Sequence, residues 1–111
     1  MTGQQMDALA LANRARQAKK RLRAELMGLD RRQALAVAAS ILEDDRECTE
    51  GLLAGVTVGT MLAWVEGTGP AQAARLCSSA GTDATRKLRE ITPLRRAALA
   101  GFLRRNPRAR R

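Results

Sequence analysis

The sequence contains no histidine and no tyrosine, and its large aromatic side chains are limited to Trp64 and Phe102. Without histidine the chain cannot form a Ser-His-Asp triad, a Cys-His nucleophile pair or a histidine-containing zinc site. Two aromatic residues are also fewer than single-strand nucleic-acid binders usually present for base stacking. We therefore predict an aliphatic core and expect no catalysed reaction, no cofactor and no bound metal.

Cysteines and long apolar runs are also scarce. Cys48 and Cys77 stand 29 residues apart without a C-x-x-C pair, which favours reduced thiols in a cytoplasmic protein. We expect Cys77 to be a small core residue, and the acidic surroundings of Cys48 to disfavour its thiolate. No apolar run approaches the ~18 residues that span a bilayer, and the start of the sequence lacks a secretory pattern. No membrane partner is expected.

Positive charge is the most informative property of this 111-residue chain. Twenty lysine and arginine residues face eleven acidic residues, which gives a net charge of +9. Residues 14–32 carry +6, residues 43–50 carry −4 and residues 86–111 carry +9. A strongly basic balance is typical of proteins that meet a polyanion, with nucleic acid as the leading class. The uneven distribution indicates one attractive side on a single domain.

Apolar residues recur at helical spacing almost throughout, and no window alternates as a strand does, so we predict an all-α fold. Residues 7–27 form a long helix with a narrow apolar stripe, and basic side chains occupy most of its remaining circumference. Because so small a core cannot cover the whole helix, we expect part of it to project as a basic arm that lies apart from the other basic segments. Its basic residues include Arg14, Lys20, Arg21 and Arg23.

Helix caps divide the rest of the chain. Asp30 and Gln33 form a capping-box pattern at the start of a second helix, and we interpret the acidic residues 43–50 as its end followed by a loop. Three shorter helices should then cover residues 58–65, 71–79 and 94–103. Their starts are marked by Thr57, by Pro70 and by Thr92-Pro93. In the last helix we expect Leu94, Ala98, Phe102 and Leu103 to face the core.

The turn Gly67-Thr68-Gly69 lies between two of these short helices. Glycine permits positive φ and lets backbone N–H groups approach a phosphate, while the start of the following helix adds partial positive charge. A G-x-G between helices is also a common tight turn. The basic cluster Arg86, Lys87 and Arg89, which surrounds Leu88, follows about 17 residues later and favours the phosphate interpretation.

From Leu52 to Leu103 the sequence resembles, without gaps, the integration host factor of actinobacteria, a nucleoid-associated protein unrelated to the heterodimeric bacterial protein of the same name. The resemblance lies in a short helix, the G-x-G turn, a second helix, Thr85-Arg86-Lys87-Leu88-Arg89 and a final amphipathic helix. It implies a helix-two-turns-helix fold and a protein that binds double-stranded DNA with little sequence preference, bends or compacts it, and assists phage integration. A recombinase or integrase on the same DNA is then the implied protein partner.

Carried over residue by residue, the resemblance places Gly67, Gly69, Arg86, Lys87 and Arg89 on DNA phosphates, with Thr68 inside the turn. From the charge of the first helix we add Arg14, Lys20, Arg21 and Arg23 as DNA-binding residues. Two departures from the family stand out. Pro70 replaces the lysine that usually follows the G-x-G turn, and Glu90-Ile91-Thr92 replaces a G-L-G. Either this surface binds DNA more weakly, or the basic first helix and tail compensate.

We expect three parts: a basic N-terminal helix at residues 1–29, a helical core at 30–104 with the helix-two-turns-helix at about 52–104, and a disordered basic tail at 105–111. The expected state is a monomer associated with the nucleoid in the cytoplasm. The main alternative is an rRNA-binding or ribosome-bound protein. A glycosylase remnant is disfavoured because the chain opens with Met-Thr and has no zinc finger, and a membrane-surface helix because its apolar side is mostly alanine.

Overall fold

The computed structural model describes residues 3–105, and within this range the chain forms six α-helices and no strand, which confirms the all-α prediction. The helices are α1 (Gly3–Gly28), α2 (Arg31–Glu43), α3 (Asp45–Thr49), α4 (Val58–Ala63), α5 (Pro70–Ser79) and α6 (Pro93–Arg104), with a 3-10 turn at Leu88–Glu90. The expected disordered tail, apart from Arg105, lies outside the described residues. None of the described helices combines the length and the apolarity needed to cross a membrane.

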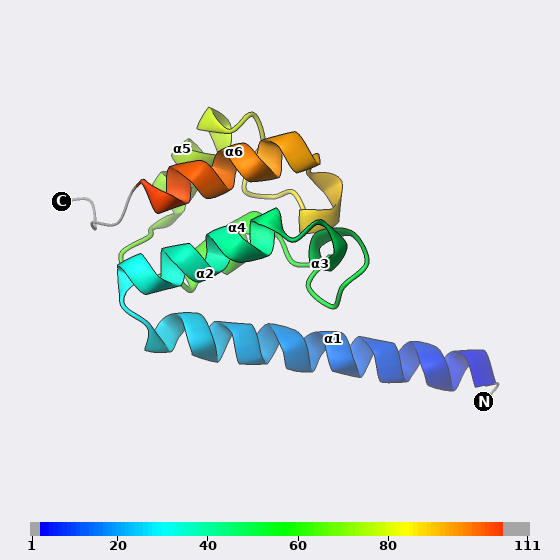
Figure 1. Ribbon diagram of the computed structural model, residues 1–111. Coiled ribbons are helices and arrows are strands. Elements are labelled where there is room, and N and C mark those ends of the chain that lie inside the picture. The colour runs from blue at the N-terminus through cyan, green and yellow to red at the C-terminus, as the bar shows by residue number, and fades with distance from the viewer. Residues whose placement is uncertain (1–2, 106–111) are drawn as a thin grey trace.

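Helices α2 and α6 pack side by side, and α1 runs along the edge of the molecule beneath α2 (Figure 1). The N-terminal end of α1 extends beyond the other helices (Figure 1), as its length predicted. The part that precedes Leu11 contains no lysine or arginine and exposes Met6 and Leu9. The projecting end therefore carries one acid, Asp7, and no cation, so the expectation of a projecting basic arm was wrong in this respect. Arg14, Lys20 and Arg21 are exposed, as expected.

The core is aliphatic, as the scarcity of aromatic residues predicted. Leu26 of α1 is fully buried and Leu22 nearly so, which anchors the C-terminal half of α1 to the remaining helices. Trp64 is only partly buried against this core. The largest fully buried apolar side chains are Leu26, Leu35, Leu42, Met61, Leu62, Leu88, Leu99 and Leu103.

The predicted helix starts are confirmed. The side chain of Asp30 accepts a hydrogen bond from the N–H of Gln33 at 2.8 Å, and Thr57 accepts one from the N–H of Thr60 at 3.2 Å. Thr92 caps α6 in the same way. These caps satisfy backbone donors that a helix start leaves without partners, so the boundaries follow from local sequence.

Two local predictions were wrong. Residues 43–50 contain the expected helix end, at Glu43, but the expected loop is instead the short helix α3, which begins where the carboxylate of Asp44 accepts from the N–H of Glu47. In α6, Leu94 and Ala98 do not face the core, and Leu94 is 82% exposed. Arg96 takes that place, and the buried residues of α6 are Arg96, Leu99, Ala100 and Leu103.

The basic segment that follows α5 lies antiparallel to the chain that leads into α4. The N–H of Leu88 donates to the carbonyl of Val56 at 2.9 Å, and the N–H of Arg89 donates to that of Ala54 at 3.1 Å. The N–H of Val58 in turn donates to the carbonyl of Arg86 at 3.0 Å. These bonds hold the basic segment at a defined register, with Leu88 in the core.

Candidate nucleic-acid interface

The three basic residues of segment 86–89 do not form one cluster. Arg86 pairs with Asp83 at 3.4 Å and borders a hollow that it shares with Glu90 and Arg95. Arg89 borders a different groove, on the side of α1. The backbone N–H of Lys87 donates to the carboxylate of Glu90 at 2.8 Å. The carboxylate of Glu90 therefore caps the start of the 3-10 turn of this segment.

Arg89 and α1 form the walls of one groove, which we call the Arg89 groove. Arg16 and Lys19 of α1 line it together with Arg89, and Glu50 is the acidic residue in its lining. Its other lining residues are small or apolar: Leu11, Ala15, Gly51, Leu52, Ala54, Gly55 and Val56. Three cations thus surround a narrow apolar floor, so the groove presents positive charge that one acid offsets only in part.

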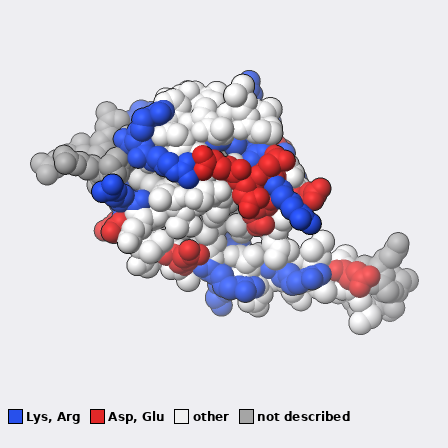
Figure 2. All heavy atoms as spheres, viewed as in Figure 1, with Lys and Arg blue, Asp and Glu red and all other residues white. Residues whose placement is uncertain are grey.

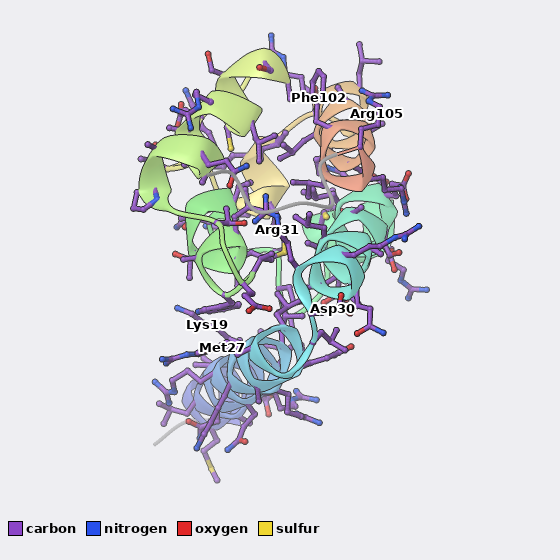
Figure 3. The ribbon with its side chains drawn as sticks, turned by 90° about the vertical axis from the view of Figure 1, so that its left-hand side faces the viewer. Lys19, Met27, Asp30, Arg31, Phe102 and Arg105 are labelled. Carbon is purple, nitrogen blue, oxygen red and sulfur yellow. The ribbon has the colours of Figure 1, made fainter. Side chains whose placement is uncertain are left out.

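The cations of α1 divide into two sets around the helix. At about 100° per residue, Arg16, Lys19, Lys20 and Arg23 fall within roughly 100° of the circumference, and we call this set the basic flank. No acidic residue of α1 falls in that sector. Figure 3 shows Lys19 and Met27 on the side of α1 that faces α4, away from α2. The basic flank and the Arg89 groove therefore share one side of the molecule.

Arg14 and Arg21 lie on the opposite flank of α1, in the sector that also contains Asp7 and Glu25. Arg21 borders a groove with Glu25 and with two further acids, Asp44 and Glu47. On the face that includes α2 and α3, acidic side chains gather between basic ones (Figure 2). Positive charge on this flank is thus balanced by nearby acids, unlike that of the basic flank.

The expected separation between the first helix and segment 86–89 was therefore wrong for part of the helix, because Arg16 and Lys19 share a groove with Arg89. The four α1 residues named from charge alone divide between the flanks: Lys20 and Arg23 lie on the basic flank and Arg14 and Arg21 on the other. Arg16 and Lys19 were not singled out from the sequence. A helical projection of the charges, with acids included, would have selected them.

The G-x-G turn is held from beneath by Arg31, the first residue of α2. Nη1 of Arg31 donates to the hydroxyl of Thr68 at 2.6 Å and to the carbonyl of Glu66 at 3.0 Å. Nη2 donates to the side-chain oxygen of Gln72 at 3.2 Å. Figure 3 places Arg31 between α2 and this turn. No local sequence signal marks Arg31, since its partners follow it by 35 to 41 residues.

The three residues of the turn differ in their availability. Gly67 has φ of 77°, which only glycine adopts readily, and it is exposed. Thr68 is buried, and its N–H donates to the carbonyl of Val65. Gly69 is exposed, and a Cβ at this position would meet no atom within 4 Å. The surface of the turn is therefore formed by Gly67 and Gly69, while Thr68 supports it from inside.

The turn lies at the C-terminal end of α1. Met27, Gly28 and Asp30 line a hollow together with residues 63–69. A second, smaller hollow joins Gly69 and Pro70 to Ala84, close to the start of the basic segment. The turn thus lies beside the C-terminal end of α1, whereas the Arg89 groove lies beside residues 11–19 of the same helix.

The thiols offer no reactive group. Burial raises the pKa of Cys77 to about 11. The pKa of Cys48 is raised as well, chiefly by burial; Arg96 opposes this shift, and Asp44 and Glu47 add smaller contributions that raise the pKa. The expected acidic influence is therefore present but smaller than burial. Within residues 3–105 no group of three or more Cys, Asp and Glu side chains is arranged to hold a metal ion.

No protein-family model, curated protein or solved structure matches this chain.

Proposed function

We propose that this protein binds the phosphate backbone of double-stranded DNA through the basic flank of α1 and the Arg89 groove, with little preference for sequence. The observation that carries the proposal is the segregation of charge on α1. Four cations share a sector that contains no acid and faces the side of Arg89, whereas the acids of α1 share the other flank with Arg14 and Arg21. Such an arrangement produces a field that attracts a polyanion to one side of the molecule.

The spacing of these cations suits a strand of phosphates. Residues 16–23 span about 10 Å along the helix axis at 1.5 Å per residue, and the phosphates of one strand follow at about 3.4 Å of duplex axis. Long, exposed lysine and arginine side chains on a helix flank neutralise phosphates without reading base edges. Binding should therefore be sensitive to salt and insensitive to sequence.

Bending of the duplex is part of the proposal and depends on a second contact. The G-x-G turn lies at the C-terminal end of α1, near Met27, so contacts at the turn and at Lys19 would be about 12 Å apart along the helix axis. Two contacts on one duplex allow bending and thereby compaction, whereas one contact allows only coating. Bending and compaction of DNA are also what the resemblance to the actinobacterial family implies.

The test is a salt titration of binding to duplex DNA of two unrelated sequences and to A-form RNA of equal length. The proposal requires similar affinities for the two DNA sequences and a linear fall of log K with log salt, with a slope of about −0.9 per phosphate contacted. Tighter binding to the A-form RNA would favour the ribosomal or rRNA-binding alternative. A clear preference for one DNA sequence would contradict the backbone mechanism.

A further inference from the structure

The most unusual charged group of the molecule is the guanidinium of Arg31. Its side chain is 6% exposed, and its three hydrogen bonds go to a backbone carbonyl, a hydroxyl and a side-chain amide. Its Nε is buried without a hydrogen-bond partner. Within the described residues, no ion pair includes Arg31. A full positive charge is therefore buried among neutral acceptors.

Arg96, the other buried arginine of the described residues, has the more usual arrangement. It donates to the carbonyls of Leu42 and Ile91 and forms an ion pair with Asp45. A buried charge is costly unless it is both hydrogen-bonded and paired. Arg96 satisfies both conditions and Arg31 only the first. Burial accordingly lowers the pKa of Arg31.

The unpaired charge of Arg31 lies behind the start of α5. Its Nη atoms bond to Thr68 in the G-x-G turn and to Gln72 in the first turn of α5. Helix α5 begins at Pro70 and has no side-chain cap at Gly69, so the positive end of the helix dipole and the first N–H groups face outward beside an exposed glycine. Two sources of positive potential, the dipole and Arg31, therefore lie at the start of α5.

We propose that Arg31 is the positioning residue of the G-x-G turn and supplies the positive charge with which the turn binds a phosphate group. This inference rests on the proposed function and identifies a residue outside segment 52–104 that makes the turn work. Pro70 stands where the actinobacterial family usually has a lysine, and it also lacks an N–H. Arg31 compensates for that loss from the inner side of the turn. Because it is buried, it acts through the turn and does not touch the phosphate.

The test uses the full chain and inorganic phosphate as the probe, followed by amide NMR. In the wild type, phosphate should shift the amide resonances of Gly69, Ala71 and Gln72. Arg31→Met should weaken this binding at least about tenfold, which corresponds to about 1.4 kcal/mol. Arg31→Lys, which keeps the charge, should retain most of it. The matched control is Arg32→Met, which removes the same charge from the adjacent, exposed position and should have little effect.

Wild-type shifts at the turn that persist unchanged in Arg31→Met would overturn the inference. If Arg31→Met does not fold, the wild-type titration and Arg31→Lys still test the inference. The absence of any phosphate-induced shift at the turn in the wild type contradicts it. Complete loss of phosphate binding in Arg31→Lys, which keeps the charge, contradicts it as well. Thr68→Val removes the 2.6 Å partner of Arg31 and should weaken phosphate binding without removing charge.

Duplex DNA provides the second arm of the experiment. Shifts of the same amides on addition of DNA, lost in Arg31→Met and kept in Arg32→Met, support the inference for a backbone phosphodiester. DNA binding through α1 with no shift at the turn overturns the inference and the bending part of the proposed function, and leaves backbone binding through the basic flank and the Arg89 groove intact. Phosphate binding at the turn without any DNA binding supports the role of Arg31 and contradicts the proposed function.

Discussion

Lys19 of α1 and Arg89 of the basic segment line the same groove, although they are far apart in sequence. The groove contains one further cation, Arg16, and one acid, Glu50. Glu50 pairs only loosely with Arg46, at 3.9 Å and with both side chains largely exposed. Its charge is therefore free to oppose a polyanion that enters the groove.

Replacing this acid should strengthen DNA binding. A unit charge about 6 Å from a phosphate in water is worth roughly 0.7 kcal/mol, or about a threefold change in affinity. We expect Glu50→Gln to bind duplex DNA about threefold more tightly at low salt. Glu25→Gln removes the same charge from the opposite flank of α1 and should change the affinity less. Equal effects of the two substitutions would show that only net charge matters.

The proline after the G-x-G turn offers a second gain-of-function test. Pro70→Lys adds a cation and an N–H at the start of α5, and both favour an anion there. We expect a steeper salt dependence of DNA binding, by about 0.9 in the slope of log K against log salt for one added phosphate contact. Pro93→Lys is the matched control, because Pro93 is the exposed first residue of α6. A gain of equal size in both variants would argue against a phosphate at the turn.

Arg96 and Asp45 form one ion pair, but replacing Arg96 should destabilise the fold more than replacing Asp45. Arg96→Met leaves the buried carbonyls of Leu42 and Ile91 without their donor and should lower the free energy of unfolding by about 3 kcal/mol. Asp45 is 68% exposed, and solvent screening reduces its share, so Asp45→Asn should cost about 1 kcal/mol. Urea denaturation of both variants measures the difference. A cost for Asp45→Asn that equals the cost for Arg96→Met would contradict this account.

Cys77 should make the stability of the fold depend on alkaline pH. Because its pKa is raised to about 11 in the folded protein, the folded state holds its proton more tightly than the unfolded state does. Its contribution is therefore complete below the thiol's ordinary pKa of about 9 and declines by roughly 1.4 kcal/mol per pH unit as the pH rises towards 11. Cys77→Ala should remove this decline. The measurement is the free energy of unfolding against pH, and an identical slope in both proteins would contradict burial as the cause.

Local features of the fold were predictable because they depend on neighbouring residues. The caps at Asp30, Thr57 and Thr92 require only a suitable side chain and an N–H three residues later, and all three are present. Where a residue is governed by distant partners, prediction failed. Leu94 has the right character for a core position, but Arg96 occupies the core because Asp45 and the carbonyl of Leu42, both more than 50 residues away in sequence, receive its donors.

The candidate site follows the same division. The G-x-G turn and its positive φ at Gly67 were accessible from sequence, because glycine spacing between helices has a direct conformational meaning. The groove that Lys19 shares with Arg89 and the burial of Arg31 could not be predicted from sequence, because each depends on how α1 and α2 pack against segments that come much later in the chain. A charge count over residues 14–32 cannot separate the two flanks of α1.

The most direct test of the account compares two double variants that remove equal charge from the two flanks of α1. Lys19→Ala/Arg23→Ala empties half of the basic flank, and Arg14→Ala/Arg21→Ala removes two exposed cations from the flank that contains Asp7 and Glu25. The affinity for duplex DNA is measured across a salt titration. Only the first variant should lose two phosphate contacts, with a slope shallower by about 1.8, on DNA of any sequence. Equal losses in the two variants would contradict a DNA-binding surface on the basic flank.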